Sequence, residues 1–159
     1  MMRLLALFLA YLSLSACGLQ PLYSGGSKGA VTSLLGSVIV EPIEGKPGWL
    51  VRNEINDRLN AATSVAGSAA RYRLVVKLDD QIEGFGVRTD DTVTRERRTL
   101  RARYQLVDIT TGATLLDTTA GSDAGIDVVS SEYATIAGEN SALENLAQRV
   151  AEQIVTRLS

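Results

Sequence analysis

Polar and apolar side chains alternate along two long segments in the middle of the chain. Most even positions are apolar in 72–82 and again in 100–106, while the odd positions between them are mostly charged or polar. Alternation with a period of two is typical of strands that have one buried and one exposed face. We therefore predict two long strands over 72–82 and 93–107, joined by a hairpin whose tip is 88–92.

Two shorter strands flank this pair in the sequence. Residues 37–43 contain a Val-Ile-Val run followed by Pro42, which has no backbone N–H and therefore predicts a sheet edge or the end of a strand. After a turn at 110–112, residues 113–120 predict a fourth strand. The stretch 121–130 is predicted to be irregular.

Two other segments have the periodicity of amphipathic helices. After a turn predicted at 45–48, an apolar stripe predicts a helix over 49–62, and its members are Val51, Ile55, Leu59 and Ala62. A second stripe predicts a C-terminal helix, and its members are Leu143, Leu146, Val150, Ile154 and Leu158. Gly138 interrupts that pattern, because glycine costs about 1 kcal/mol relative to alanine in a helix. The start of this helix is therefore placed between Ser131 and Ser141.

The resulting order of elements is βαβββα. Two amphipathic helices can cover one face of a four-stranded sheet, so the predicted fold is an α+β two-layer sandwich with a mostly antiparallel sheet. We expect residues 36–159 to form one such domain.

The N-terminal segment has the pattern of a bacterial lipoprotein signal peptide. Arg3 precedes an uncharged apolar stretch at 4–14, and Leu14-Ser15-Ala16-Cys17 follows. This pattern predicts removal of 1–16 and attachment of acyl chains, such as palmitate, to Cys17. The alternative is a free or buried Cys after an ordinary signal peptide.

The residues after Cys17 predict where the protein is held. Gly18, rather than Asp, follows the acylated position, which favours sorting to the outer membrane, at its periplasmic face. Residues 17–35 are rich in Gly and Ser around 24–33 and predict a flexible tether between the lipid and the domain.

Composition restricts the chemistry of the domain. The 159 residues include no His and one Cys, which disfavours general-base catalysis, zinc sites and disulfides. We predict no enzyme activity, no metal and no cofactor. A net charge of −2 and a pI near 5.2 disfavour nucleic-acid binding. The acids at 79, 80, 83, 90 and 91 lack the spacing of a calcium loop and are predicted to be solvated turn residues.

Seven cations on or beside the two long strands share one parity. They are Arg95, Arg97, Arg101 and Arg103 on the second strand, with Arg71, Arg73 and Lys77 on or beside the first. If both strands bury their apolar sets together, these cations lie on one open face, which suits phosphate or carboxylate ligands. The alternative is an ordinary solvated face that neighbouring acids balance.

The chain resembles the LPS-assembly lipoprotein family LptE (also called RlpB), in particular its alphaproteobacterial members. The resemblance rests on the βαβββα order and on the start of the mature chain, Cys17-Gly18-Leu19-Gln20-Pro21-Leu22-Tyr23. It implies a non-enzymatic protein that plugs the outer-membrane β-barrel LptD, helps it fold and assists lipopolysaccharide insertion. It also implies contact with lipid A phosphates through basic sheet residues, here Arg97, Arg101 and Arg103, with Arg71, Arg73 and Lys77 as weaker candidates.

Two other classes share a lipid anchor, a tether and a small α+β domain. One is an auxiliary lipoprotein of an ABC-type lipid transporter, and the other is an activator of cell-wall synthases. A periplasmic hydrolase is disfavoured, because the sequence has no recognisable pair of nucleophile and base.

Overall fold

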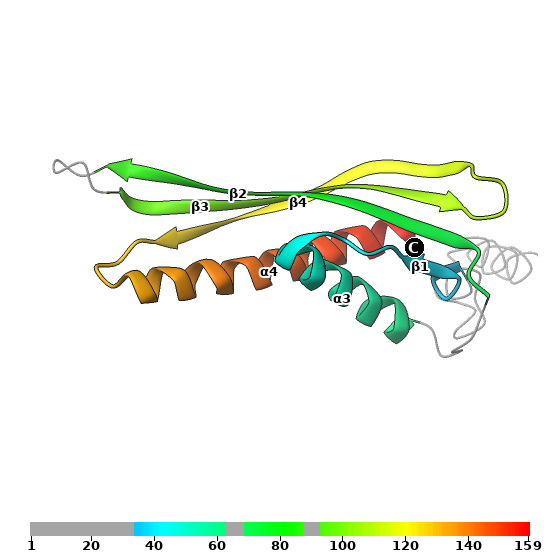
Figure 1. The fold of residues 1–159 in the computed structure, drawn as a ribbon, viewed down its shortest axis with the longest axis horizontal. Coiled ribbons are helices and arrows are strands. Elements are labelled where there is room, and N and C mark those ends of the chain that lie inside the picture. The colour runs from blue at the N-terminus through cyan, green and yellow to red at the C-terminus, as the bar shows by residue number, and fades with distance from the viewer. Residues whose placement is uncertain (1–33, 63–68, 88–92) are drawn as a thin grey trace, which may run out of the picture.

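The computed structural model describes residues 34–62, 69–87 and 93–159. Its elements form two layers, with a four-stranded sheet above two helices in Figure 1. In chain order they are β1 (Val38–Val40), α3 (Gly45–Ala62), β2 (Tyr72–Val87), β3 (Val93–Asp108), β4 (Thr114–Asp127) and α4 (Glu132–Leu158). The order βαβββα and the α+β sandwich confirm the predicted fold class.

The sheet is mixed and its strands follow chain order, β1-β2-β3-β4. β1 is parallel to β2, whereas β2–β3 and β3–β4 are antiparallel. β1 is shorter than the predicted strand. The Glu41 N–H still donates to the Leu74 carbonyl at 3.0 Å, and Pro42 then has no N–H to continue the pairing. The predicted effect of Pro42 as the end of the strand is confirmed.

The even-numbered side chains of β2 and β3 face the helices, and those of 72–78 and 100–106 form the core. We call this side of the sheet the inner face and the opposite side the outer face. The most deeply buried strand residues include Leu74, Leu100, Ala102 and Tyr104. They pack in one cluster with the predicted helical stripes, of which Val51, Ile55, Val150 and Ile154 are fully buried. Burial of these side chains supplies the main driving force for the sandwich.

β4 continues to Asp127, so the prediction of irregular structure from Gly121 onward is wrong. Its inner-face positions there hold small or apolar residues, and Ile126 is buried. Gly121 and Gly125 alternate with them on the outer face, where missing side chains weaken the sequence signal of a strand. Pairing with β3, where Gly121 lies opposite Arg101 and Gly125 opposite Arg97, overrides this low propensity.

α3 begins at Gly45, so the predicted turn at 45–48 is instead the first turn of the helix. Pro47 is compatible with that position, because the first helical N–H groups have no intrahelical acceptor. Gly48 is required by packing, since a Cβ there would lie 2.5 Å from the Ile43 carbonyl oxygen. α4 starts at Glu132, inside the predicted interval, and accommodates Gly138.

Several predictions fall outside the described residues. They are the signal peptide 1–16, the acylated Cys17, nearly all of the tether 17–35, and the hairpin tip 88–92. Within the described ranges, neither long helix contains an uninterrupted apolar stretch of the length needed to cross a membrane.

Arg98 and Asp80 form an ion pair on the inner face, whose core is apolar. Their side chains are 11% and 17% exposed, and the guanidinium donates to both carboxylate oxygens of Asp80, at 2.8 and 2.6 Å. Arg98 also donates to the Glu139 carbonyl on α4 at 2.9 Å. The expectation that Asp80 is a solvated turn residue is therefore wrong, because its even position turns it towards Arg98.

Asp108 closes the turn between β3 and β4. Its Oδ1 accepts the N–H groups of Thr110 and Thr111 at 2.8 and 3.0 Å, and Gly112 occupies the left-handed region at φ 71°. The Thr111 N–H is the main cause that lowers the pKa of Asp108 below its ordinary 3.8; burial opposes it, and Thr110 and Arg71 assist. The folded chain therefore favours the ionised carboxyl group.

This arrangement predicts an acid-sensitive turn. A carboxyl whose pKa is lowered by folding stabilises the fold above its ordinary value of 3.8, and this stabilisation is lost as the pH falls through the lower folded pKa. The free energy of unfolding, followed by urea titration from pH 7 to pH 2, should decrease less steeply in Asp108→Asn. A residual slope is expected from Asp117, whose pKa is also lowered. An unchanged pH profile in the variant would contradict this role.

Candidate functional site

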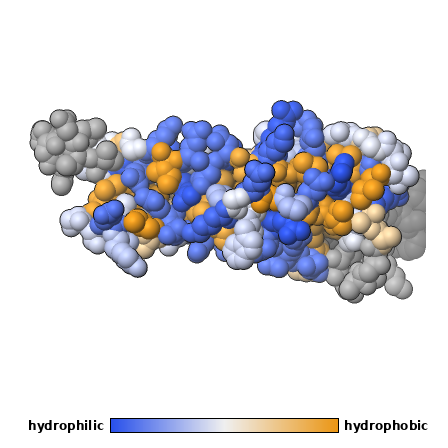
Figure 2. Space-filling model, in the orientation of Figure 1, coloured by the Kyte–Doolittle hydropathy of each residue, from blue (hydrophilic) through white to orange (hydrophobic). Residues whose placement is uncertain are grey.

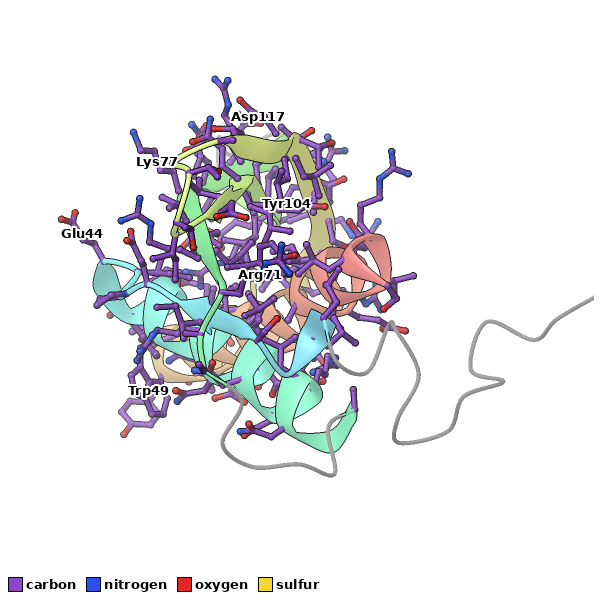
Figure 3. All side chains as sticks on the ribbon, turned by 90° about the vertical axis from the view of Figure 1, so that its right-hand side faces the viewer. Glu44, Trp49, Arg71, Lys77, Tyr104 and Asp117 are labelled. Carbon is purple, nitrogen blue, oxygen red and sulfur yellow. The ribbon has the colours of Figure 1, made fainter. Side chains whose placement is uncertain are left out.

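The outer face of the sheet carries most of the predicted ligand-binding residues. Figure 3 shows Lys77 and Asp117 projecting from the side of the sheet opposite the helices, whereas Tyr104 lies between the two layers. In Figure 2, hydrophilic side chains project along the upper rim, which is the sheet in that view. The cations on the three long strands of this face are Arg73, Lys77, Arg95, Arg97, Arg101 and Arg103.

Carboxylates are interleaved with these cations. The acids on the same strands and the same face are Asp79, Glu83, Asp117, Asp123 and Asp127. The cations therefore share a face, as predicted, but that face is almost electrically balanced, as the alternative interpretation held. Three ion pairs connect β3 to β4, and they are Arg95–Asp127 at 3.0 Å, Arg101–Asp123 at 3.4 Å and Arg103–Asp117 at 3.0 Å.

These pairs are exposed, so each stabilises the fold only slightly. Asp117 raises the pKa of Arg103 mainly through its hydrogen bond, and the same bond lowers the pKa of Asp117. Because the arginine side chains in these pairs remain 56–67% exposed, each can still meet a ligand.

The cations at the two ends of the face lie apart from the middle. At the end near β1, Arg71 lies before β2, 3.9 Å from Asp108, and Arg73 pairs with Glu41 at 3.3 Å. Towards the hairpin tip, Arg97 lies over the Phe85 ring, 5.3 Å from its centroid. These three predicted site residues are therefore not brought together with the others.

Lys77, Arg101 and Arg103 do come together at the middle of the face. Lys77 lies directly opposite Arg103 in the β2–β3 register. Two like charges at opposed positions destabilise a sheet, and no acid of the described chain pairs with the Lys77 ammonium. A hollow of about 660 Å³ opens beside them, and its polar lining consists of Lys77, Asp79, Arg101, Arg103, Thr119 and Gln153.

Gly121 shapes the β4 side of this hollow. A Cβ at that position would lie 2.5 Å from Arg101 Cδ and 2.6 Å from one of its terminal nitrogens, so the Arg101 side chain lies across the bare backbone. Gln153 of α4 accepts the Gly121 N–H at 3.1 Å and donates to its carbonyl at 3.3 Å. The hollow thus presents two guanidinium groups, an ammonium, a hydroxyl and an amide against one carboxylate, that of Asp79. Because the cations outnumber the acid, this chemistry still suits phosphate oxygens.

The described residues show no corresponding site for a metal. Asp79 and Glu83 point to the outer face and Asp80 to the inner face, and in the described ranges no three acidic or thiol side chains gather closely enough to hold an ion.

Comparison with known protein families shows which family the chain belongs to. A family model described as LptE, lipopolysaccharide-assembly, matches residues 35–158. The chain belongs to the LptE family. The resemblance read from the mature N-terminus and the element order is therefore confirmed, and LptE is a family of non-enzymatic lipopolysaccharide-assembly lipoproteins. Absence of enzyme activity in this particular chain stays a prediction.

Solved structures agree with the LptE assignment. A Caulobacter crescentus protein described as a lipoprotein is 28% identical, with a TM-score of 0.64 over 80% of this chain and 92% of that one. A minor lipoprotein from Acinetobacter baumannii is 14% identical, with a TM-score of 0.62 over 79% and 92%. Rare lipoprotein B from Shewanella oneidensis is 11% identical, with a TM-score of 0.57 over 77% and 91%. The last two show the fold alone. Comparison with curated protein sequences finds no match.

Proposed function

We propose that this LptE-family protein is an outer-membrane lipoprotein that plugs the LptD β-barrel, helps it assemble and assists lipopolysaccharide insertion into the outer leaflet. Family membership supports the connection with lipopolysaccharide transport. The signal pattern before Cys17, and Gly18 after it, support a lipid anchor at the periplasmic face of the outer membrane.

The ligand contact that we propose is between lipid A phosphates and Lys77, Arg101 and Arg103. The observation that carries it is the unpaired Lys77 opposite Arg103 at the edge of the hollow. A bound phosphate would relieve the repulsion between these two cations and accept bidentate hydrogen bonds from the guanidinium groups. Arg97, Arg71 and Arg73 lie at the two ends of the same face, outside this proposed contact.

One double variant tests both parts of the proposal. Arg101→Glu/Arg103→Glu should weaken binding of purified lipopolysaccharide at least about tenfold, because two charge-assisted contacts are lost. Binding by the unaltered protein should fall as salt rises. The variant should still co-purify from membranes with a large β-barrel, because the proposed plug contact does not require these two side chains.

The matched control is Arg71→Glu/Arg73→Glu, which changes charge equally at the end of the face. It should retain most of the affinity. Unchanged binding by the first variant would overturn the phosphate contact, and recovery of an inner-membrane transporter or a cell-wall synthase in place of a barrel would overturn the proposed partner.

A further inference from the structure

β2 has a neighbouring strand on its outer side for only a short part of its length. β1 pairs with Tyr72–Leu74, and Glu41 makes the last backbone contact. After Pro42 the chain leaves the sheet for α3. In Figure 1 β2 continues well beyond β1, towards the hairpin tip. We call the part from Val76 to Gly84 the β2 edge.

The backbone of the β2 edge is available for pairing. The Tyr72 N–H and the Leu74 carbonyl point to the β1 side, where they bond to Ser37 and Glu41. Alternate residues of a strand direct their N–H and C=O to the same side, so Val76, Leu78, Asp80, Ile82 and Gly84 do so as well. The described chain places no strand there.

The other edge of the sheet is occupied at its middle by a side chain of α4. Gln153 on α4 bonds to both the N–H and the carbonyl of Gly121 in the middle of β4, as a neighbouring strand would. The sheet therefore has one protected edge and one accessible edge.

Two carboxylates on the outer face of the β2 edge have no cation partner within the described ranges. Asp79 accepts hydrogen bonds from the Gln81 amide, at 3.1 and 3.3 Å. The arginines opposite Asp79 and Glu83 in the register are engaged elsewhere, because Arg101 pairs with Asp123 and Arg97 lies over an aromatic ring. Asp79 and Glu83 are therefore available to pair with basic side chains of a strand beside β2.

The inner face of the same edge is suited to apolar side chains. Ile82 is 42% exposed, and a hollow of about 440 Å³ separates Val75–Leu78 from Pro42–Glu44. Asp80 does not repel an incoming strand by its charge, because Arg98 neutralises it. A strand at this edge would cover Ile82 and extend the hydrophobic layer.

We propose that the β2 edge binds an extended segment of a partner polypeptide by β-strand addition. The segment pairs its backbone with Val76–Gly84, sets basic side chains opposite Asp79 and Glu83, and places apolar side chains against Leu78 and Ile82. Backbone hydrogen bonds supply the affinity and the alternating side chains supply the specificity. This inference does not rest on the proposed lipopolysaccharide contact, because backbone pairing along β2 carries it, although Asp79 also lines the hollow of that site.

The test uses the purified full chain in detergent and a short synthetic peptide that alternates lysine and valine. Addition of the peptide should slow amide hydrogen exchange at Val76, Leu78, Asp80 and Ile82 by about tenfold or more at saturation. The odd-numbered amides of β2 should change little, because they already bond to β3. A peptide of the same sequence, N-methylated at alternate residues, keeps its charge but cannot pair, and it should bind at least about tenfold more weakly.

A charge exchange identifies the side chains. Asp79→Lys/Glu83→Lys should lose affinity for the lysine peptide and gain affinity for a peptide that alternates glutamate and valine. The matched control, Asp123→Lys/Asp127→Lys on β4, should keep the original preference. Equal binding of the methylated peptide, no exchange of preference, or self-association of the chain through Val76–Gly84 would each overturn the proposal. The two proposals are tested with different ligands, the phosphate contact with lipopolysaccharide and the strand pairing with peptides, so they fail separately.

Discussion

Arg98→Met is expected to lower the free energy of unfolding by about 3–5 kcal/mol, because it leaves the Asp80 carboxylate buried without its countercharge. The pair lies within the sandwich, with Arg98 11% exposed, and its three hydrogen bonds connect β2, β3 and α4. The bond to Asp80 raises the pKa of Arg98, so the guanidinium stays charged throughout the accessible pH range. Urea unfolding followed by circular dichroism measures the loss.

The double variant Arg98→Met/Asp80→Leu separates the cost of an orphaned charge from the net contribution of the pair. Removal of both charges leaves no buried ion, so the double variant should recover most of the lost stability. Arg103→Met, which breaks an exposed pair with Asp117, should cost less than about 1 kcal/mol. Equal losses for Arg98→Met and Arg103→Met would contradict this account.

The long strands and helices could be predicted because burial imposes a regular pattern on their side chains. Most even positions of β2 and the stripe through Val51 and Ile55 are apolar because these positions face the core. The second half of β4 could not be predicted, because Gly121 and Gly125 remove the outer-face side chains from the pattern. The start of α3 was hidden by Gly45 and Pro47, which usually mark a turn.

The position of Lys77 opposite Arg103 could also have been predicted from the sequence. Lys77 and Arg103 lie equally far from position 90, the centre of the predicted hairpin tip, so a symmetric hairpin already implies that they face each other. The balancing acids on β4 were not predictable in this way. An irregularity at Leu106/Val107 shifts the β3–β4 register, and only the structure shows that Asp117 and Asp123 share the outer face with the arginines.

Lys77→Glu should change stability and ligand binding in opposite directions. In the unaltered chain the Lys77 ammonium lies opposite Arg103 without an acid partner in the described residues, so a glutamate there replaces a repulsion by an attraction. The free energy of unfolding should rise by about 0.2–1 kcal/mol. Lipopolysaccharide affinity should fall at least about tenfold, because a cation of the proposed phosphate site becomes an anion.

Arg95→Glu is the matched control for this variant. It reverses a charge on the same face but breaks the Arg95–Asp127 pair, which lies away from the hollow. It should therefore lower stability slightly and leave lipopolysaccharide affinity nearly unchanged.

Lys77→Gln should give intermediate values for both quantities, since it removes the repulsion without adding an attraction. A sheet selected only for stability would have no reason to keep two cations opposed. If Lys77→Glu lowers stability and leaves affinity unchanged, Lys77 has a structural role and the phosphate site is wrong.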